Sequence, residues 1–403
     1  MININTIKNL YKNDFYPFLK KLGYKNVPEL VRGKSTYDYS TLTHFLDSEI
    51  ASPKGKLNKL NLDEFLYSKL FYDKNNYHYI YNLSSFLGNS KEFNFSSIRE
   101  ILKNPALKFN EQLAEITPTK ELELCCTKVI TNEDEKIVKQ IQFLFFIEEL
   151  TFKTKGKINL FCCVDISLES RFVSFKFNHN LIEDYEHKTK ILDKIVSKLQ
   201  SDFDIFKDFK IGITTHNETV VKRTIQYLFI ELSNQAEKLL QKQVDPNVEE
   251  KIIEFLDTIN VPQTADYKKQ IISVVYQHVS SSFESTLFKD GWAFRFVFKE
   301  GDNTRASSSN HDQKPVYSKQ VYWNLKELMF RKKGTDFVEA GLLWHTDSGN
   351  SPVAVKIEQK NNLIIVQYYK NSYNQIRRRG KEQYVLRKIR SGISKQRPIS
   401  KLS

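Results

Sequence analysis

Hydrophobic residues follow two different periods along this 403-residue chain. Between residues 1 and 118 they recur every three to four positions, as in Leu10, Phe15 and Leu19, which predicts a mostly helical region. From Thr119 they recur every second position, and the links between the runs are short, which favours an antiparallel sheet. The pattern predicts strands over 121–130, 140–153, 157–167 and 170–178, followed by a covering helix over about 185–200.

The helical period returns between residues 217 and 285, with Asn217 as the cap of a long first helix. A strand with one aromatic face then begins at Gly291, and a polar loop is predicted over 301–315. Beyond it we expect a helix, three strands and a final basic helix over 318–330, 337–345, 352–359, 363–369 and 373–390. The chain is therefore predicted to be α+β, with a helical domain 1–118, an antiparallel α+β domain 119–215, a helical connector 216–288 and a C-terminal α+β block 289–403.

Composition does not change the predicted fold, but it argues against several classes of protein. A hydrophobic share of 40%, with few glycines and prolines, is enough for two or three cores and argues against disorder. Four cysteines in adjacent pairs within strands do not make a disulfide framework, which indicates a reducing compartment. No apolar signal core and no membrane-spanning run of about 20 residues is present, so we expect a cytoplasmic protein without a transmembrane segment.

Positive charge is concentrated at the end of the chain. The formal net charge is +13, and the segment from Tyr369 to Ser403 has eleven basic residues against Glu382, a net charge of +10. Six of the thirteen arginines lie between Arg377 and Arg397. Arginine presents a planar fork of donors that matches phosphate, so this concentration favours contact with nucleic acid, DNA or RNA.

The predicted phosphate contacts are basic residues of this final segment, Arg377, Arg378, Arg379, Lys381, Arg387, Lys388 and Arg390. Arg295, Lys299 and Arg305 are predicted to extend the basic patch. Interspersed apolar residues such as Leu386 and Ile389 predict that part of the segment folds and docks instead of forming a solubilising tail. The alternatives are a protein partner, as in a non-catalytic subunit of a ribonucleoprotein or defence complex, and an anionic membrane surface, which ranks below nucleic acid.

One group of residues matches the pattern of a catalytic site. Asp347 is followed by Glu358-Gln359-Lys360 in a predicted order of helix, three strands and helix. This arrangement resembles the core of PD-(D/E)xK nucleases over about 60 residues. The resemblance implies that Asp347 and Glu358 hold Mg²⁺, that Lys360 steadies the attacking water or the scissile phosphate, and that Glu327 is an accessory acid.

The same residues have a structural interpretation. Lys356, Glu358 and Lys360 alternate with Val355 and Ile357, which is typical of a strand with one solvated face. The sequence thus leaves open whether the protein is an enzyme, and a magnesium cofactor is expected only for the nuclease.

Two weaker patterns also have two interpretations each. His179, Glu183, Asp184 and His187 cluster at a strand-to-helix junction, either as metal ligands or as ordinary partners of a helix N-terminus. The aromatic strand from Gly291 resembles the base-stacking strand of an RNA-recognition motif, and its alternative is a core strand.

Overall fold

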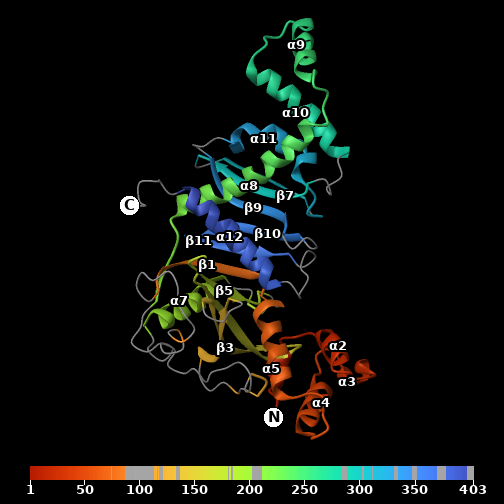
Figure 1. Cartoon of the computed structure of the whole chain (residues 1–403), viewed down its shortest axis with the longest axis vertical. Helices are drawn as coiled ribbons and strands as arrows, with labels where there is room; N and C mark the ends of the chain where they lie inside the picture. Colours follow the sequence, from red (N-terminus) through yellow and green to blue (C-terminus); the bar gives the residue numbers. More distant parts are fainter. Residues whose placement is uncertain are drawn as a thin grey trace. The chain divides into compact units, whose positions relative to one another are not determined.

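The computed structural model divides the chain into two compact units, residues 1–215 (unit 1) and 216–403 (unit 2). Both contain helices and an antiparallel sheet, which confirms the predicted α+β class (Figure 1). The finer division into four domains stays a prediction. The structure describes residues 1–73, 75–86, 96, 98, 113–115, 117, 121–132, 137–179, 181–182, 185–201, 211–282, 288–301, 304–310, 312–330, 335–346, 352–369 and 378–396.

Unit 1 begins with a group of short helices that bury a common apolar core. They are α1 (Ile4–Ile7), α2 (Lys12–Lys21), α3 (Val27–Val31), α4 (Ser40–Ala51) and α5 (Lys59–Ser68), continued by a π-helical turn Lys69–Asp73. Leu19, Leu42 and Leu62 are fully buried and pack in one cluster with sheet residues such as Leu144. Helix α5 is capped by the Asn58 side chain, which accepts a hydrogen bond from the Asn61 amide at 2.8 Å.

The sheet of unit 1 contains the predicted antiparallel meander and two additional strands. Its strands β2 (Glu123–Thr131), β3 (Val138–Phe152), β4 (Gly156–Ser167) and β5 (Phe172–Phe177) lie in chain order, and β1 (Tyr77–Ser85) pairs with β5. The short strand β6 (Gly212–Thr214) also pairs with β1. Helix α7 (Tyr185–Ser201) buries Ile191, Leu192, Ile195 and Leu199, as its period predicted.

All four cysteines of this sheet are free and buried. Burial raises the pKa of the Cys125 thiol to about 12 and raises the pKa of Cys126 and Cys162 well above the ordinary range. Because thiolate is the reactive form, these three thiols are predicted to be inert in the folded protein.

We expect the native thiols to react with a disulfide reagent near pH 8 at least about 100-fold more slowly than in denaturant. Unfolded thiols ionise near pH 8.5 whereas the buried ones do not, so the free energy of unfolding should fall as the pH rises above about 8.5. Kinetics of thiol labelling, with and without denaturant, measure the first effect. Fast labelling of Cys125, Cys126 or Cys162 in the native state would contradict this expectation.

Unit 2 begins with three helices and continues with antiparallel strands and two further helices. The helices are α8 (Glu218–Gln241), α9 (Val248–Thr258) and α10 (Ala265–Ser282), followed by β7 (Gly291–Glu300), β8 (Thr304–Ser309), a 3₁₀ turn Val316–Ser318 and α11 (Gln320–Phe330). Strands β9 (Thr335–His345), β10 (Pro352–Lys360) and β11 (Leu363–Tyr368) lead to the final helix α12 (Arg378–Gln396). The strand order in this unit is β11-β10-β9-β7-β8, and each neighbouring pair is antiparallel.

Helices α8 and α12 cover the same face of the sheet of unit 2 (Figure 1). Phe229 of α8 contacts Phe296 of β7 and Phe337 of β9, with ring centroids 5.6 and 5.1 Å apart. Helix α12 packs closely against α8 at Gly392, where a Cβ atom would lie 2.9 Å from Cγ2 of Thr224. The basic helix is therefore docked, as its apolar residues predicted.

Two expectations for the β7 region have different outcomes. The four aromatic residues of β7 are at most 9% exposed, which agrees with the core interpretation and leaves no face for base stacking. The predicted loop 301–315 is wrong in part, because Thr304–Ser309 forms strand β8 at the edge of the sheet. Hydrophobic alternation could not reveal this strand, since its side chains are polar and its stability comes from backbone pairing with β7.

None of the helices in the described part of the chain is long and apolar enough to cross a membrane, as the sequence predicted.

Candidate nucleic-acid interface

Helix α12 has an apolar inner face and a basic outer face. Val385, Ile389 and Ile393 are buried, whereas Arg379 and Arg387 are exposed. The helix contains seven basic residues and one acid, a net charge of +6. Arg379 and Arg387 are eight positions apart, which places them about 12 Å apart along one side of the helix. Within the described residues neither arginine has an ion-pair partner.

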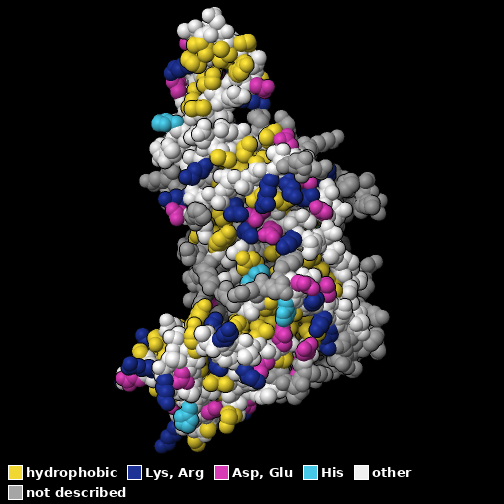
Figure 2. Space-filling view, turned by 180° about the vertical axis from the view of Figure 1, so that it is seen from behind, with side chains coloured by type: hydrophobic (Ala, Val, Ile, Leu, Met, Phe, Trp, Pro, Cys, Tyr) yellow, Lys and Arg dark blue, Asp and Glu magenta, His cyan; other side chains and the backbone are white. Residues whose placement is uncertain are grey.

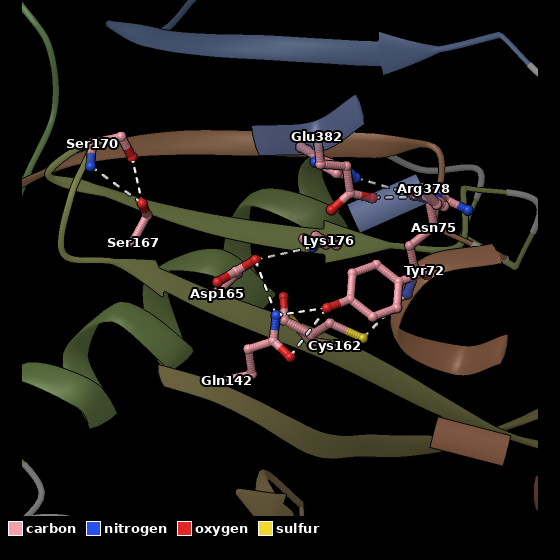
Figure 3. Close-up of polar contacts among 12 residues, drawn as sticks. Tyr72, Asn75, Gln142, Cys162, Asp165, Ser167, Ser170, Lys176, Arg378 and Glu382 are labelled. Carbon is pink, nitrogen blue, oxygen red and sulfur yellow. Dashed lines mark hydrogen bonds and ion pairs between the residues drawn. The ribbon is translucent and has the colours of Figure 1, made fainter. Parts of the chain in front are cut away.

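Other residues predicted to contact phosphate are used inside the protein. Arg378 is 1% exposed, and its Nε lies 3.1 Å from Oε1 of Glu382, one helical turn away (Figure 3). Lys381 is also buried and donates a hydrogen bond from Nζ to the Pro352 carbonyl at 3.1 Å. In this conformation both side chains face inward, which leaves little of either for a ligand. Arg377 lies outside the described residues.

The remaining basic residues of α12 are intermediate cases. Lys388 is partly exposed and lies 3.7 Å from a carboxylate oxygen of Glu231 on α8. Lys395 donates a hydrogen bond to the Tyr227 hydroxyl, also on α8. Arg390 is half-buried. Lys388 and Lys395 are thus tied to α8, and Arg379 and Arg387 are the most exposed arginines of the helix.

The predicted extension of the patch lies on the other face of the sheet. Arg295 neighbours Phe296, which contacts α8, so the alternation of a strand points Arg295 away from that helix. Lys299 is four positions further along β7 on the same face and is opposite Arg305 of β8. The structure therefore does not bring Arg295, Lys299 and Arg305 together with the outer face of α12.

A row of alternating charges crosses this second face. Arg295 of β7 forms an ion pair with Glu339 of β9, and Glu339 lies 3.6 Å from Lys356 of β10. Lys356 in turn lies 2.8 Å from Glu358 on the same strand. Dark blue and magenta side chains are intermixed on this side of unit 2 in Figure 2. Opposite charges are thus paired across neighbouring strands, as in a solvated sheet face.

The residues of the nuclease resemblance are only partly described. Glu358 and Lys360 lie on the same face of β10, as a carboxylate-x-lysine pair on a strand requires. Asp347 and the side chain of Glu327 on α11 lie outside the described part of the structure. Glu339 is directly opposite Glu358 across β9 and β10. The sequence did not single out Glu339, because its pairing depends on strand register, although an acid inside an apolar strand was a visible signal.

The predicted histidine cluster is divided between two environments of unit 1. His187 lies 2.6 Å from Oε1 of Glu148, beside a cavity of about 480 Å³. His179 stacks on Tyr77 with ring centroids 3.6 Å apart, and its Nε2 lies 2.9 Å from the Tyr79 hydroxyl. Glu183 and Asp184 are outside the described residues. Among the residues that the structure describes, no group of three or more His, Cys, Asp or Glu side chains could hold a metal ion.

A buried polar network occupies the sheet of unit 1 (Figure 3). Nζ of Lys176 lies 3.4 Å from Oδ2 of Asp165, and both side chains are at most 5% exposed. Gln142 donates a hydrogen bond to the same oxygen at 3.3 Å, and the Lys176 ammonium lies 4.4 Å from the centre of the Phe71 ring. Because both charges are enclosed, this network affects the stability of unit 1 and is not accessible to a macromolecular ligand.

Comparisons of this chain with protein-family models, with curated proteins and with solved structures found no match. Within the described residues, the two charged surfaces of unit 2 differ in one respect. On the outer face of α12, Arg379 and Arg387 have no paired acid, whereas the opposite sheet face carries the alternating row of paired charges. An uncompensated positive surface is the one that attracts a polyanion.

Proposed function

We propose that unit 2 binds DNA or RNA by contacting phosphates with the outer face of α12. Arg379 and Arg387 are the principal contacts, and Lys388 and Arg390 add charge beside them. The observation that carries the proposal is that α12 is a docked helix with two exposed arginines that no carboxylate of the described residues neutralises. A docked helix presents its charges in a fixed arrangement, which costs less conformational entropy on binding than ordering a free tail.

The spacing and the surrounding charge support this proposal. About 12 Å between the two arginines corresponds to three or four phosphates of one strand, at roughly 3.4 Å per charge. The sequence adds Lys370 and Arg377 before the helix and Arg397 and Lys401 after it. Free cysteines in the sheet of unit 1 support a cytoplasmic location as part of the same proposal.

The proposal predicts a specific effect of removing the two arginines. Arg379→Gln/Arg387→Gln should weaken binding about 10- to 100-fold near 0.1 M salt, because each lost phosphate contact reduces the slope of log K against log salt by about 0.9 on duplex DNA. Fluorescence anisotropy with labelled single- and double-stranded DNA and RNA measures this change.

A matched control removes the same charge from the opposite sheet face. Lys299→Gln/Arg305→Gln should leave affinity and salt slope within about twofold of the unaltered chain. Equal losses in the two double variants would mean that only net charge matters, and no loss in Arg379→Gln/Arg387→Gln would remove α12 from the interface.

A Mg²⁺-dependent nuclease of the PD-(D/E)xK type is a second candidate, and one observation favours it. Glu358 and Lys360 share a face of β10, and Glu339 is opposite Glu358, so two carboxylates and a lysine meet on this surface. This face is turned away from α12, so the two candidates use different surfaces. If the nuclease exists, Glu358→Gln should abolish cleavage in the presence of Mg²⁺ and leave binding unchanged.

A further inference from the structure

The helices α9 and α10 of unit 2 form a hairpin with an unusual amount of exposed apolar surface. Phe255 and Ile259 of α9 are 51% and 46% exposed, and Tyr267 and Val274 of α10 are 44% and 64% exposed. In Figure 2 hydrophobic side chains gather on this hairpin, at the top of the view. Contiguous apolar surface of this kind marks an interaction site more often than chance exposure does.

The exposed apolar residues of α10 lie away from its contacts with the rest of unit 2. Helix α10 packs on the rest of unit 2 through its other side, where Tyr276 contacts Trp323 and Ser280 donates a hydrogen bond to the Tyr317 carbonyl. Tyr267, Ile271 and Val274 are spaced by four and three positions and form the opposite side of the helix. On α9, Phe255 and Ile259 follow Ile252 at i+3 and i+7, so they extend the apolar face of buried Ile252 and Leu256 outward, with Ile259 at the end of the helix. Each helix therefore presents exposed apolar side chains that the rest of unit 2 does not cover.

The charges of the hairpin are unequally distributed between its two helices. Helix α9 has four acids, Glu249, Glu250, Glu254 and Asp257, against Lys251. Helix α10 begins with Asp266 and then has Lys268 and Lys269, for a net charge of +1. One helix is acidic and the other slightly basic, and both carry an exposed apolar stripe.

We propose that the α9–α10 hairpin is a docking surface for a second copy of this chain. A two-fold axis would set α9 of each chain against α10 of the other, and the two hairpins would form a four-helix bundle. This pairing covers both apolar stripes and places the acidic helix of each chain beside the lysines of its partner. A partner with only one kind of charge would satisfy one helix of the hairpin and repel the other.

The first test is the mass of the protein in solution, measured by light scattering after size-exclusion chromatography. The full chain should have about twice the 47.4 kDa of one copy, and Phe255→Glu/Val274→Glu should have the mass of one copy. Leu60→Glu is the control, because Leu60 is 43% exposed in unit 1 and should leave the dimer intact. An unaltered chain that stays monomeric up to roughly 100 µM, far above the micromolar range of specific association, would overturn the proposal.

The second test exploits the two-fold pairing and does not depend on loss of association alone. One variant, Glu250→Lys/Glu254→Lys, reverses the charge of α9. The other, Lys268→Glu/Lys269→Glu, reverses the charge of α10. In a dimer of either variant alone, α9 and the α10 of the partner chain would carry charge of the same sign at both contacts. Each variant alone should therefore be mostly monomeric. Mixed together, they should recover a dimer containing one chain of each kind. Dimers formed by either variant alone, or a mixture that stays monomeric, would contradict the pairing of α9 with α10.

Discussion

Replacing Lys176 by methionine is expected to lower the free energy of unfolding of unit 1 by about 3–5 kcal/mol. The substitution keeps the length of the side chain but removes the ammonium that lies 3.4 Å from Asp165 in the buried network. Asp165 would then be an enclosed carboxylate that keeps the hydrogen bond from Gln142. The contact of the Lys176 ammonium with the Phe71 ring would be lost as well.

Hydrogen exchange of the β4 and β5 amides, followed by mass spectrometry, measures this loss in unit 1 directly. The control is Lys176→Met combined with Asp165→Leu, which removes both charges and should recover much of the lost stability. If the single and double variants were equally destabilised, the loss would come from altered packing and not from an uncompensated carboxylate.

Arg378→Met is expected to lower the stability of unit 2 by about 3 kcal/mol, in contrast to its exposed neighbour Arg379. Arg378 is 1% exposed and paired with Glu382, so the variant would leave a buried carboxylate without this partner. Arg379→Met should change stability by at most about 0.5 kcal/mol, because Arg379 is exposed. Two adjacent arginines would thus have separate effects, one on stability and the other on binding.

Tryptophan fluorescence during urea denaturation is a suitable measurement, because Trp292, Trp323 and Trp344 all belong to unit 2. Arg378→Met/Glu382→Leu should be more stable than Arg378→Met, since it removes the unpaired acid as well. Nucleic-acid binding by Arg378→Met, measured under conditions where the variant is folded, should stay close to that of the unaltered chain. A large loss of affinity in the folded variant would show that Arg378 turns outward to reach phosphate.

The sequence predicts most of the strands because their hydrophobic residues recur at every second position. Phe172–Phe177 is an example, in which Val173, Phe175 and Phe177 fall on alternate positions. Strand β8 could not be predicted in this way, because TRASSS has no apolar alternation and forms through backbone pairing at an edge. Where side-chain burial does not stabilise an element, the hydrophobic pattern does not report it.

For the candidate site, the sequence predicts features that depend on one helix but not features that depend on how distant elements pack. The burial of Arg378 follows from helical phase, since Arg378, Glu382, Val385, Ile389 and Ile393 recur at spacings of four, three, four and four along one side of α12. This phase was available in the sequence. The separation of Arg295 and Arg305 from α12 was not, because it depends on which face of the sheet the helix covers.

The central claim, that the outer face of α12 binds nucleic acid through phosphates, is tested most directly by a salt series. Affinity of the full chain for labelled DNA and RNA is measured by anisotropy from about 50 to 200 mM salt and compared with Arg379→Gln/Arg387→Gln. We predict a steep, linear loss of log K with log salt in the full chain and a slope shallower by about 1.8 in the double variant. Affinity that is weak and independent of salt, with the same slope in both proteins, would contradict the claim.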